Sequence, residues 1–202
     1  PPSIPGGHDS VVPVTSVARF AFCPRQYYLS RYLGLPTQTP APINANPDPE
    51  ADAGEWTASE FGVAVHEILA GKSIENPPPE AITLAARFHA SPLGRRLENA
   101  SRLGREYDFL IELEDMILRG QIDLWFEESG ELILVDYKSD LVAPGGERRH
   151  AYRYGAQIRL YALALERLTG RLPDHAFLWY LRTETPVPAS LHPQAIAEAR
   201  GL

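Results

Sequence analysis

Two acidic residues and a lysine near the middle of the chain have the types and spacing of a hydrolytic site. Asp123 ends the segment Gly120-Gln-Ile-Asp123, and Asp136 and Lys138 belong to Asp136-Tyr-Lys138. Paired carboxylates bind a divalent cation, and a neighbouring ammonium group can position water or stabilise a developing negative charge. Metal-assisted phosphodiester hydrolysis requires this combination of groups.

A β-hairpin over residues 119–139 is predicted to bring these side chains together. Ser129-Gly130 suits a two-residue turn, because glycine accepts a positive φ and apolar residues run on both sides. This turn places Asp123 opposite Asp136, with Cβ atoms about 4.5 to 5.5 Å apart. The same face carries Lys138 opposite Gln121. Two like charges across a sheet repel, and a shared cation would offset the repulsion.

The other face of the hairpin is predicted to pack on a hydrophobic core, because side chains alternate along a strand. It carries the cross-strand pairs Ile122 with Tyr137, Leu124 with Val135, and Phe126 with Ile133. The acidic pair has a second interpretation, in which both carboxylates are solvated charges on an open sheet face. Lys138 on the same face favours a site.

Composition indicates one α/β domain of 202 residues, 44% of them hydrophobic. No apolar run approaches the ~20 residues that span a bilayer, and no signal peptide opens the chain, so we expect a soluble cytoplasmic protein. The first residue is Pro rather than Met, so we expect a piece of a longer polypeptide. The single cysteine, Cys23, excludes an internal disulfide and a four-cysteine metal site, and is expected to be a buried thiol on a helix.

The net charge of −7 is unfavourable for a nucleic-acid partner, but positive charge is concentrated in residues 148–171. Six arginines there oppose one acidic residue, Glu166, which leaves a local charge of +5. The arginines are Arg148, Arg149, Arg153, Arg159, Arg167 and Arg171. They could hold a phosphate backbone or form a solvated helix face, and both interpretations stay open.

The N-terminal third is predicted to be helical around a proline-rich loop at 36–54. A helix begins at Thr15 or Ser16 as N-cap and breaks at Pro24. Most of its apolar residues are expected in the core, namely Val17, Phe20, Tyr27, Tyr28 and Leu33. A further helix over 55–70 places Gly62 and His66 on one face, because they are four residues apart.

The rest of the chain is predicted to alternate between helices and strands. Short helices cover 80–89 and 92–100, and a strand over 105–113 carries Glu106. A long helix over 148–169 ends at Gly170 and places Gln157 and Tyr161 on one face. A strand over 175–183 and a helix over 193–200 complete the chain.

Four short motifs follow one another in an order that resembles the PD-(D/E)xK nuclease superfamily, in its RecB-like branch. They are Gly62-x-x-x-His66, Gly120-x-x-Asp123, Asp136-x-Lys138 and Gln157-x-x-x-Tyr161. The resemblance covers about residues 14–182. It implies an α/β fold with a restriction-endonuclease-like core, in which helices flank a central mixed β-sheet.

The sequence departs from the family pattern at two places. Cys23-Pro-Arg resembles the first ligand segment of the iron-sulfur members, but the three partner cysteines are missing, so we expect no iron-sulfur cluster. Ile122 stands where the family often has proline before the aspartate.

The resemblance assigns roles to individual residues. It implies a Mg²⁺ or Mn²⁺ site formed by His66, Asp123, Asp136 and the backbone carbonyl of Tyr137. Lys138 would position or deprotonate the attacking water. Gln157 and Tyr161 would orient water, Lys138 or a phosphate. Glu106 either joins the metal site or is a charge at the sheet edge.

The resemblance also implies a biological context. We expect residues 1–202 to be one metal-dependent deoxyribonuclease domain, with exonuclease activity, joined to a DNA helicase in double-strand-break repair. No P-loop sequence occurs, so an ATP-driven motor would lie on another domain or subunit. The alternatives are an inactive nuclease fold that binds DNA or protein, and a stand-alone exonuclease of the CRISPR-associated type.

Overall fold

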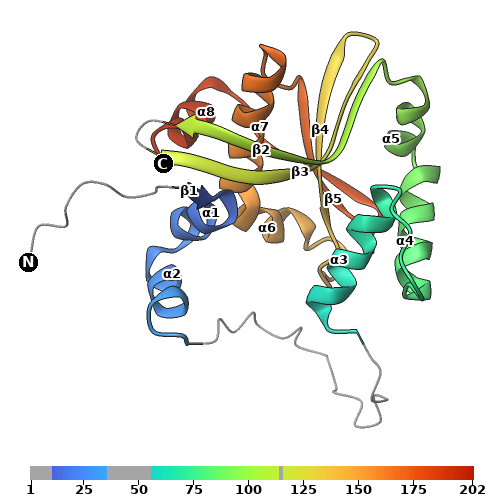
Figure 1. The fold of residues 1–202 in the computed structure, drawn as a ribbon, viewed down its shortest axis with the longest axis horizontal. Helices are drawn as coiled ribbons and strands as arrows, with labels where there is room; N and C mark the ends of the chain where they lie inside the picture. The colour runs from blue at the N-terminus through green and yellow to red at the C-terminus, as the bar shows by residue number, and fades with distance from the viewer. Residues whose placement is uncertain (1–10, 36–55, 114–115) are drawn as a thin grey trace, which may run out of the picture.

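A mixed β-sheet forms the centre of the computed structural model, which describes residues 11–35, 56–113 and 116–202 (Figure 1). The sheet runs in the order β1-β3-β4-β5-β6, and β2 pairs with the remaining edge of β3. The strands are β1 (Val11–Pro13), β2 (Arg102–Leu113), β3 (Met116–Glu128), β4 (Glu131–Lys138), β5 (His175–Tyr180) and β6 (Thr185–Pro188). The mixed sheet expected from the sequence is confirmed; β1 and β6 were not predicted.

Strand β3 changes partner along one of its edges. Its first half pairs with β1 as far as Arg119, and its second half pairs with β4 from Leu124 onward. Residues 120–123 lie between these two ladders, with β2 on the opposite edge. The sheet therefore forks at Asp123, and β3 presents backbone and side chains there that no strand on this edge covers.

The predicted hairpin register is confirmed from the turn to Leu124. Ser129 and Gly130 both have positive φ, 53° and 86°, which two-residue hairpin turns require. Cα partners run from Glu128 with Glu131 to Leu124 with Val135. The ladder stops there, one pair short of the predicted facing of Asp123 and Asp136.

One predicted face assignment is wrong. Ile122 was expected beside Leu124 and Tyr137, yet it belongs to the core cluster on the other face, with Trp125. The cause is a local distortion, because neither Glu106 nor Asp123 is bridged although their neighbours pair on both sides. Glu106 has a left-handed φ of 45° at this point, and the alternation of side chains on β3 shifts opposite it.

Helices cover both faces of the sheet. On one face lie α3 (Ala58–Leu69), α4 (Pro79–Ala90) and α5 (Pro92–Arg95), followed by a 3₁₀ turn, η1 (Arg96–Asn99). On the other lie α1 (Val14–Phe22), α7 (Gly155–Thr169) and α8 (Pro193–Arg200). Figure 1 shows α3 to α5 together at one side of the sheet and α1, α7 and α8 at the other. Each face thus has its own hydrophobic cluster.

Local sequence explains where several of these helices begin and end. Thr57 and Glu60 form a capping box at the start of α3, since each side chain accepts the other's backbone N–H. Gly170 ends α7 with a left-handed φ of 82°. The predicted N-cap at Thr15 or Ser16 is wrong, because α1 already begins at Val14.

The N-terminal helices are less buried than expected. Pro24 does divide α1 from α2 (Pro24–Arg31), as predicted. Val17 is buried, but Phe20, Tyr28 and Leu33 are exposed and Tyr27 is half-buried. Helical spacing alone overstated this core, because α2 packs on α1 and carries no buried residue. Cys23 is half-buried at the N-cap of α2 rather than inside a helix.

The predicted helix over 148–169 is broken. It consists of α6 (Glu147–Ala151), a 3₁₀ turn η2 (Tyr152–Tyr154) and α7. The proline-rich segment 36–54 lies outside the described residues. In the part of the chain that the structure describes, no helix is long and apolar enough to cross a membrane.

Candidate active site

Asp123 occupies the fork between β1 and β4. Its side chain is buried, and Oδ2 accepts the backbone N–H of Tyr137 at 2.7 Å. This bond holds β3 to β4 just beyond the end of their ladder. The second oxygen, Oδ1, faces His66.

His66 reaches Asp123 from α3. Its Nδ1 lies 3.4 Å from Oδ1 of Asp123 and 3.6 Å from Oε1 of Glu106. The helix lies close to the end of β4, because a Cβ added at Gly62 would be 3.2 Å from Oγ of Ser139. The absent side chain of Gly62, on the same helix face as His66, allows this packing.

Glu106 is held in an unusual backbone conformation. Its φ of 45° lies in the left-handed region, although it is part of strand β2. Its Oε1 is buried and has no hydrogen-bond partner among the described residues. A buried acceptor without a partner is costly, so this oxygen is suited to a ligand that the protein itself does not supply.

Together these three residues fit a divalent cation. One ligand atom each from His66, Glu106 and Asp123 can be chosen so that all lie within 4.8 Å of one another. The two carboxylates of this donor set favour Mg²⁺, and the imidazole makes Mn²⁺ a good substitute. Glu106, left open between two roles by the sequence, therefore lies with the metal-site candidates.

Asp136 is separate from this group and is paired instead with the lysine. It is 1% exposed, and its Oδ2 lies 2.5 Å from Nζ of Lys138. Its Oδ1 accepts a hydrogen bond from Nε2 of Gln157 at 3.2 Å. The site thus has two adjoining parts, a ligand cluster and an ion pair.

The ammonium group of Lys138 also rests on an aromatic ring. Nζ lies 4.1 Å from the ring centroid of Tyr154, a favourable distance for a cation-π contact. The hydroxyl of Tyr154 donates to Oδ2 of Asp140 at 3.1 Å. These contacts hold the lysine side chain in one position. The sequence motifs assigned neither Tyr154 nor Asp140 to the site.

Gln157 and Tyr161 border the site from α7. Nε2 of Gln157 donates to the hydroxyl of Tyr161 at 3.0 Å as well as to Asp136. The ring of Tyr161 packs edge-on against Phe109, over the backbone of Gly120. A Cβ at Gly120 would lie 2.6 Å from Phe109, so glycine is required for this packing.

The charges in the site shift one another's pKa values. Burial alone would lower the pKa of His66, but the neighbouring carboxylates of Asp123 and Glu106 outweigh it and raise the pKa to about 10. Burial would raise the pKa of Asp123, yet His66 and Lys138 hold it below its ordinary value. Burial, with the charge of Asp123 added and Lys138 opposing, raises the pKa of Asp136 to about 6.

The structure therefore brings most of the predicted residues to one place. His66 and Asp123 lie in the ligand cluster, whereas Asp136 contacts Lys138 and Gln157. The N–H of Tyr137 is bonded to Asp123; the role of the Tyr137 carbonyl stays a prediction.

Comparison with known proteins gives a consistent result. A family model for the PD-(D/E)XK nuclease superfamily matches residues 12–200. Proteins named as one of the subunits of an ATP-dependent helicase/nuclease are similar to this chain, with 38% identity over 109 residues in Acetivibrio thermocellus and 37% over 118 residues in Desulforudis audaxviator.

These similarities cover only part of each protein. They span 46% and 52% of this chain, and 9% and 10% of those relatives. A solved structure from Eubacterium rectale, provisionally assigned as an exonuclease, shares the fold with a TM-score of 0.51 at 13% identity. That similarity covers 95% of this chain and 76% of the other.

Proposed function

Because the chain belongs to the PD-(D/E)XK nuclease superfamily, we propose that it hydrolyses DNA phosphodiester bonds with a bound Mg²⁺ or Mn²⁺ ion. The observation that carries this proposal is the convergence of His66, Glu106 and Asp123 beside the Lys138 and Asp136 ion pair. A cation holder and a positioned ammonium group are the two parts that this reaction needs.

The ligand cluster would hold the cation. His66, Glu106 and Asp123 would supply ligands directly, and Asp136 and the carbonyl of Tyr137 would complete the set. A divalent cation there supplies positive charge to phosphoryl oxygens and lowers the pKa of bound water. The buried, unpartnered Oε1 of Glu106 supports this assignment.

Lys138 would act on the attacking water and on the negative charge of the transition state. Its Nζ is held by Asp136 and by the ring of Tyr154, so it is oriented before substrate arrives. Gln157 and Tyr161 would orient water or a phosphate oxygen, since Gln157 already contacts both Asp136 and Tyr161.

The relatives suggest the setting of this reaction. Their names describe them as parts of an ATP-dependent helicase/nuclease, and this chain matches only a small part of them. We propose that the chain processes DNA ends together with a helicase domain or subunit in double-strand-break repair. An exonuclease would degrade linear DNA and spare closed circular DNA.

The test is cleavage of linear single-stranded, linear double-stranded and closed circular DNA, with Mg²⁺, with Mn²⁺ or with a chelator. His66→Ala and Lys138→Ala are compared with His175→Ala and Lys72→Ala, which remove the same side-chain types outside the site. We expect metal-dependent degradation of linear DNA that only the first two variants lose. Degradation that survives both substitutions would overturn the assigned site, and a folded protein that binds DNA without cleaving it would be an inactive nuclease fold.

A further inference from the structure

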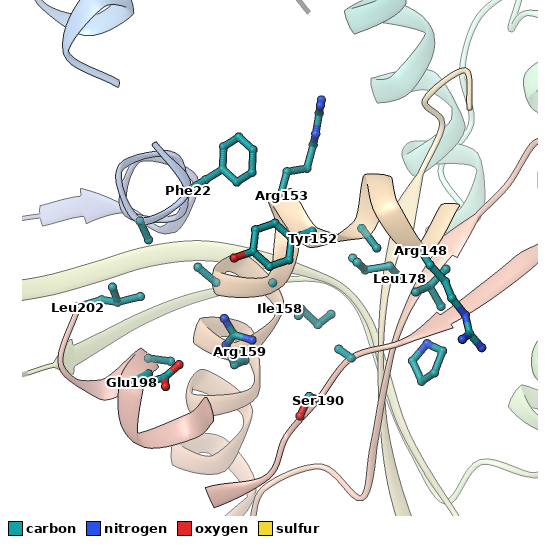
Figure 2. A pocket seen from close by; sticks show the side chains of 18 residues that line it. Phe22, Arg148, Tyr152, Arg153, Ile158, Arg159, Leu178, Ser190, Glu198 and Leu202 are labelled. Atoms are coloured by element: carbon teal, nitrogen blue, oxygen red, sulfur yellow. The ribbon is translucent and has the colours of Figure 1, made fainter. Parts of the chain in front are cut away.

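A cavity lies beside η2, on the side of α7 away from the ligand cluster. It has a volume of about 570 Å³ and is bounded by the end of α1, by η2 and α7, by β5 and β6, and by α8. Ile158 and Leu178 form part of its apolar lining. Figure 2 shows Phe22 and Tyr152 near α1 and η2, and Arg159 and Glu198 nearer to α8. Cavities of this size accept ligands as large as one or two nucleotides.

Positive charge dominates the lining of this cavity. Arg148, Arg153 and Arg159 line it, against one carboxylate, Glu198. None of the three arginines forms an ion pair with any of the residues that the structure places. Nε of Arg159 is buried and lacks a hydrogen-bond partner within the same residues. The cavity therefore offers unused donors to an anion.

Two exposed aromatic rings stand beside these arginines. Tyr152 is 82% exposed and Phe22 is 44% exposed, and their ring centroids are 6.3 Å apart at an angle of 65°. Bases of a single strand stack on such rings, whereas the paired bases of a duplex are not available to them.

The arginine-rich stretch is thus divided among several surfaces. Arg171 is paired with Asp174 and Glu127. Arg167 lines a different depression, with Glu112. Arg148, Arg153 and Arg159 line the same cavity as Phe22 and Tyr152, which makes this surface, and not the whole helix, the candidate for phosphate binding.

The cavity adjoins the proposed active site through η2. Tyr152 is two residues before Tyr154, whose ring carries the ammonium group of Lys138. Arg153 lies between the two tyrosines and extends away from the cavity in Figure 2. A strand that leaves the cavity over η2 would pass Tyr154, whose ring contacts Lys138.

We propose that this cavity binds a single DNA strand, with bases stacked on Phe22 and Tyr152, and with phosphates held by Arg159 inside the cavity and by Arg153 where the strand leaves over η2. This inference rests on the proposed function for the identity of the ligand. The strand held there would continue over η2 to the ion pair of Lys138 and Asp136. The protein would therefore need unpaired DNA at its active site even when the substrate begins as a duplex.

The first test is binding of fluorescein-labelled oligothymidine to the full chain, followed by fluorescence anisotropy in the presence of a chelator. We expect Phe22→Ala and Tyr152→Ala each to weaken binding at least about fivefold, because each removes a stacking contact. The double variant Arg153→Gln, Arg159→Gln removes two phosphate contacts. The slope of log binding constant against log salt concentration should therefore become less steep by about 1.4. Tyr32→Ala and Arg167→Gln, an exposed tyrosine and an arginine of α7 outside the cavity, should leave affinity and slope unchanged.

Cleavage of the same oligonucleotide in Mg²⁺ separates the two proposals. Cavity variants that stay folded and bind as tightly as the wild type would overturn the inference, even if all of them cleave. Binding that depends on the cavity in a protein without any cleavage would leave the inference standing and the proposed function wrong. If both hold, the aromatic variants should raise KM and retain kcat at saturating DNA.

Discussion

The carboxylate of Asp123 accepts the backbone N–H of Tyr137 at 2.7 Å, one residue beyond the last bridged pair of the β3–β4 ladder. It therefore continues the connection between the strands with a side chain in place of a backbone carbonyl. Oδ2 serves the fold, and Oδ1 remains directed toward His66. One carboxylate thus links the integrity of the sheet to the formation of the ligand cluster.

Replacing Asp123 can separate these two tasks. Asparagine keeps an acceptor for the Tyr137 N–H but has no charge, so Asp123→Asn should lose metal-dependent cleavage and should be more stable in urea than Asp123→Ala. Asp123→Ala should also lose cleavage and should be less stable by about 1 to 3 kcal/mol, because a buried N–H loses its acceptor. Equal stability of the two variants would show that the bond to Tyr137 contributes nothing to folding.

Lys138 can be compared with Lys72, the other lysine of the chain. Lys138→Met keeps an unbranched side chain near Tyr154 and removes the ammonium group. We expect kcat to fall by about 10²- to 10³-fold, the usual loss for one group that stabilises transition-state charge. Lys72→Met removes an exposed ion pair with Glu67 and should leave kcat unchanged. Comparable kcat values for both variants would contradict the role assigned to Lys138.

Metal binding should strengthen as pH rises. The pKa of His66 is raised to about 10, so the metal-free protein carries this proton at neutral pH and must release it when Nδ1 becomes a ligand. The apparent Kd for Mn²⁺, measured by isothermal titration calorimetry, should fall about tenfold per pH unit between pH 7 and 9. His66→Ala should bind more weakly and lose this slope, and His175→Ala should retain it. A Kd independent of pH would exclude His66 as a ligand.

The same shift predicts how stability depends on pH without metal. Because the folded pKa of His66 lies above its ordinary value of 6.5, its proton stabilises the fold fully below about pH 6.5. That contribution is lost as pH rises toward 10. Urea unfolding in a chelator should therefore show the wild type losing more stability than His66→Ala between pH 7 and 9.

The sequence predicted the elements whose signals are local. The Ser129-Gly130 turn set the hairpin register as far as Leu124, and Gly170 ended α7 as expected, because positive φ at these positions is encoded by residue type. The motifs also placed His66, Asp123, Lys138 and Gln157 in one region. The prediction of buried residues from helical spacing alone was wrong, because Phe20 and Tyr28 have helical periodicity but are exposed.

The details of the site depended on features that no single segment contains. The alternation that should have placed Ile122 beside Leu124 shifts at Asp123, where β2 and β3 are distorted together. The break at η2, which places Tyr154 under Lys138, is also absent from the periodicity of residues 148–169. The sequence left Glu106 open between a metal ligand and a sheet-edge charge, and only the folded sheet placed its carboxylate beside His66.

The left-handed backbone of Glu106 predicts that this residue lowers the free energy of unfolding while it supplies a ligand to the metal site. A non-glycine residue at a φ of 45° costs about 1 to 2 kcal/mol, and glycine does not incur that cost. Glu106→Gly should therefore be more stable in urea than Glu106→Ala by about that amount, whereas both should bind Mn²⁺ more weakly than the wild type. Glu112 serves as the control, because it is an exposed residue of the same strand and is not among the positive-φ positions. There we expect the opposite order: Glu112→Gly should be less stable than Glu112→Ala, because glycine has greater backbone freedom in the unfolded chain. If Glu106→Gly is the less stable of its pair, the distortion at Glu106 does not carry strain; if it binds Mn²⁺ as tightly as the wild type, Glu106 is a sheet-edge charge and not a ligand.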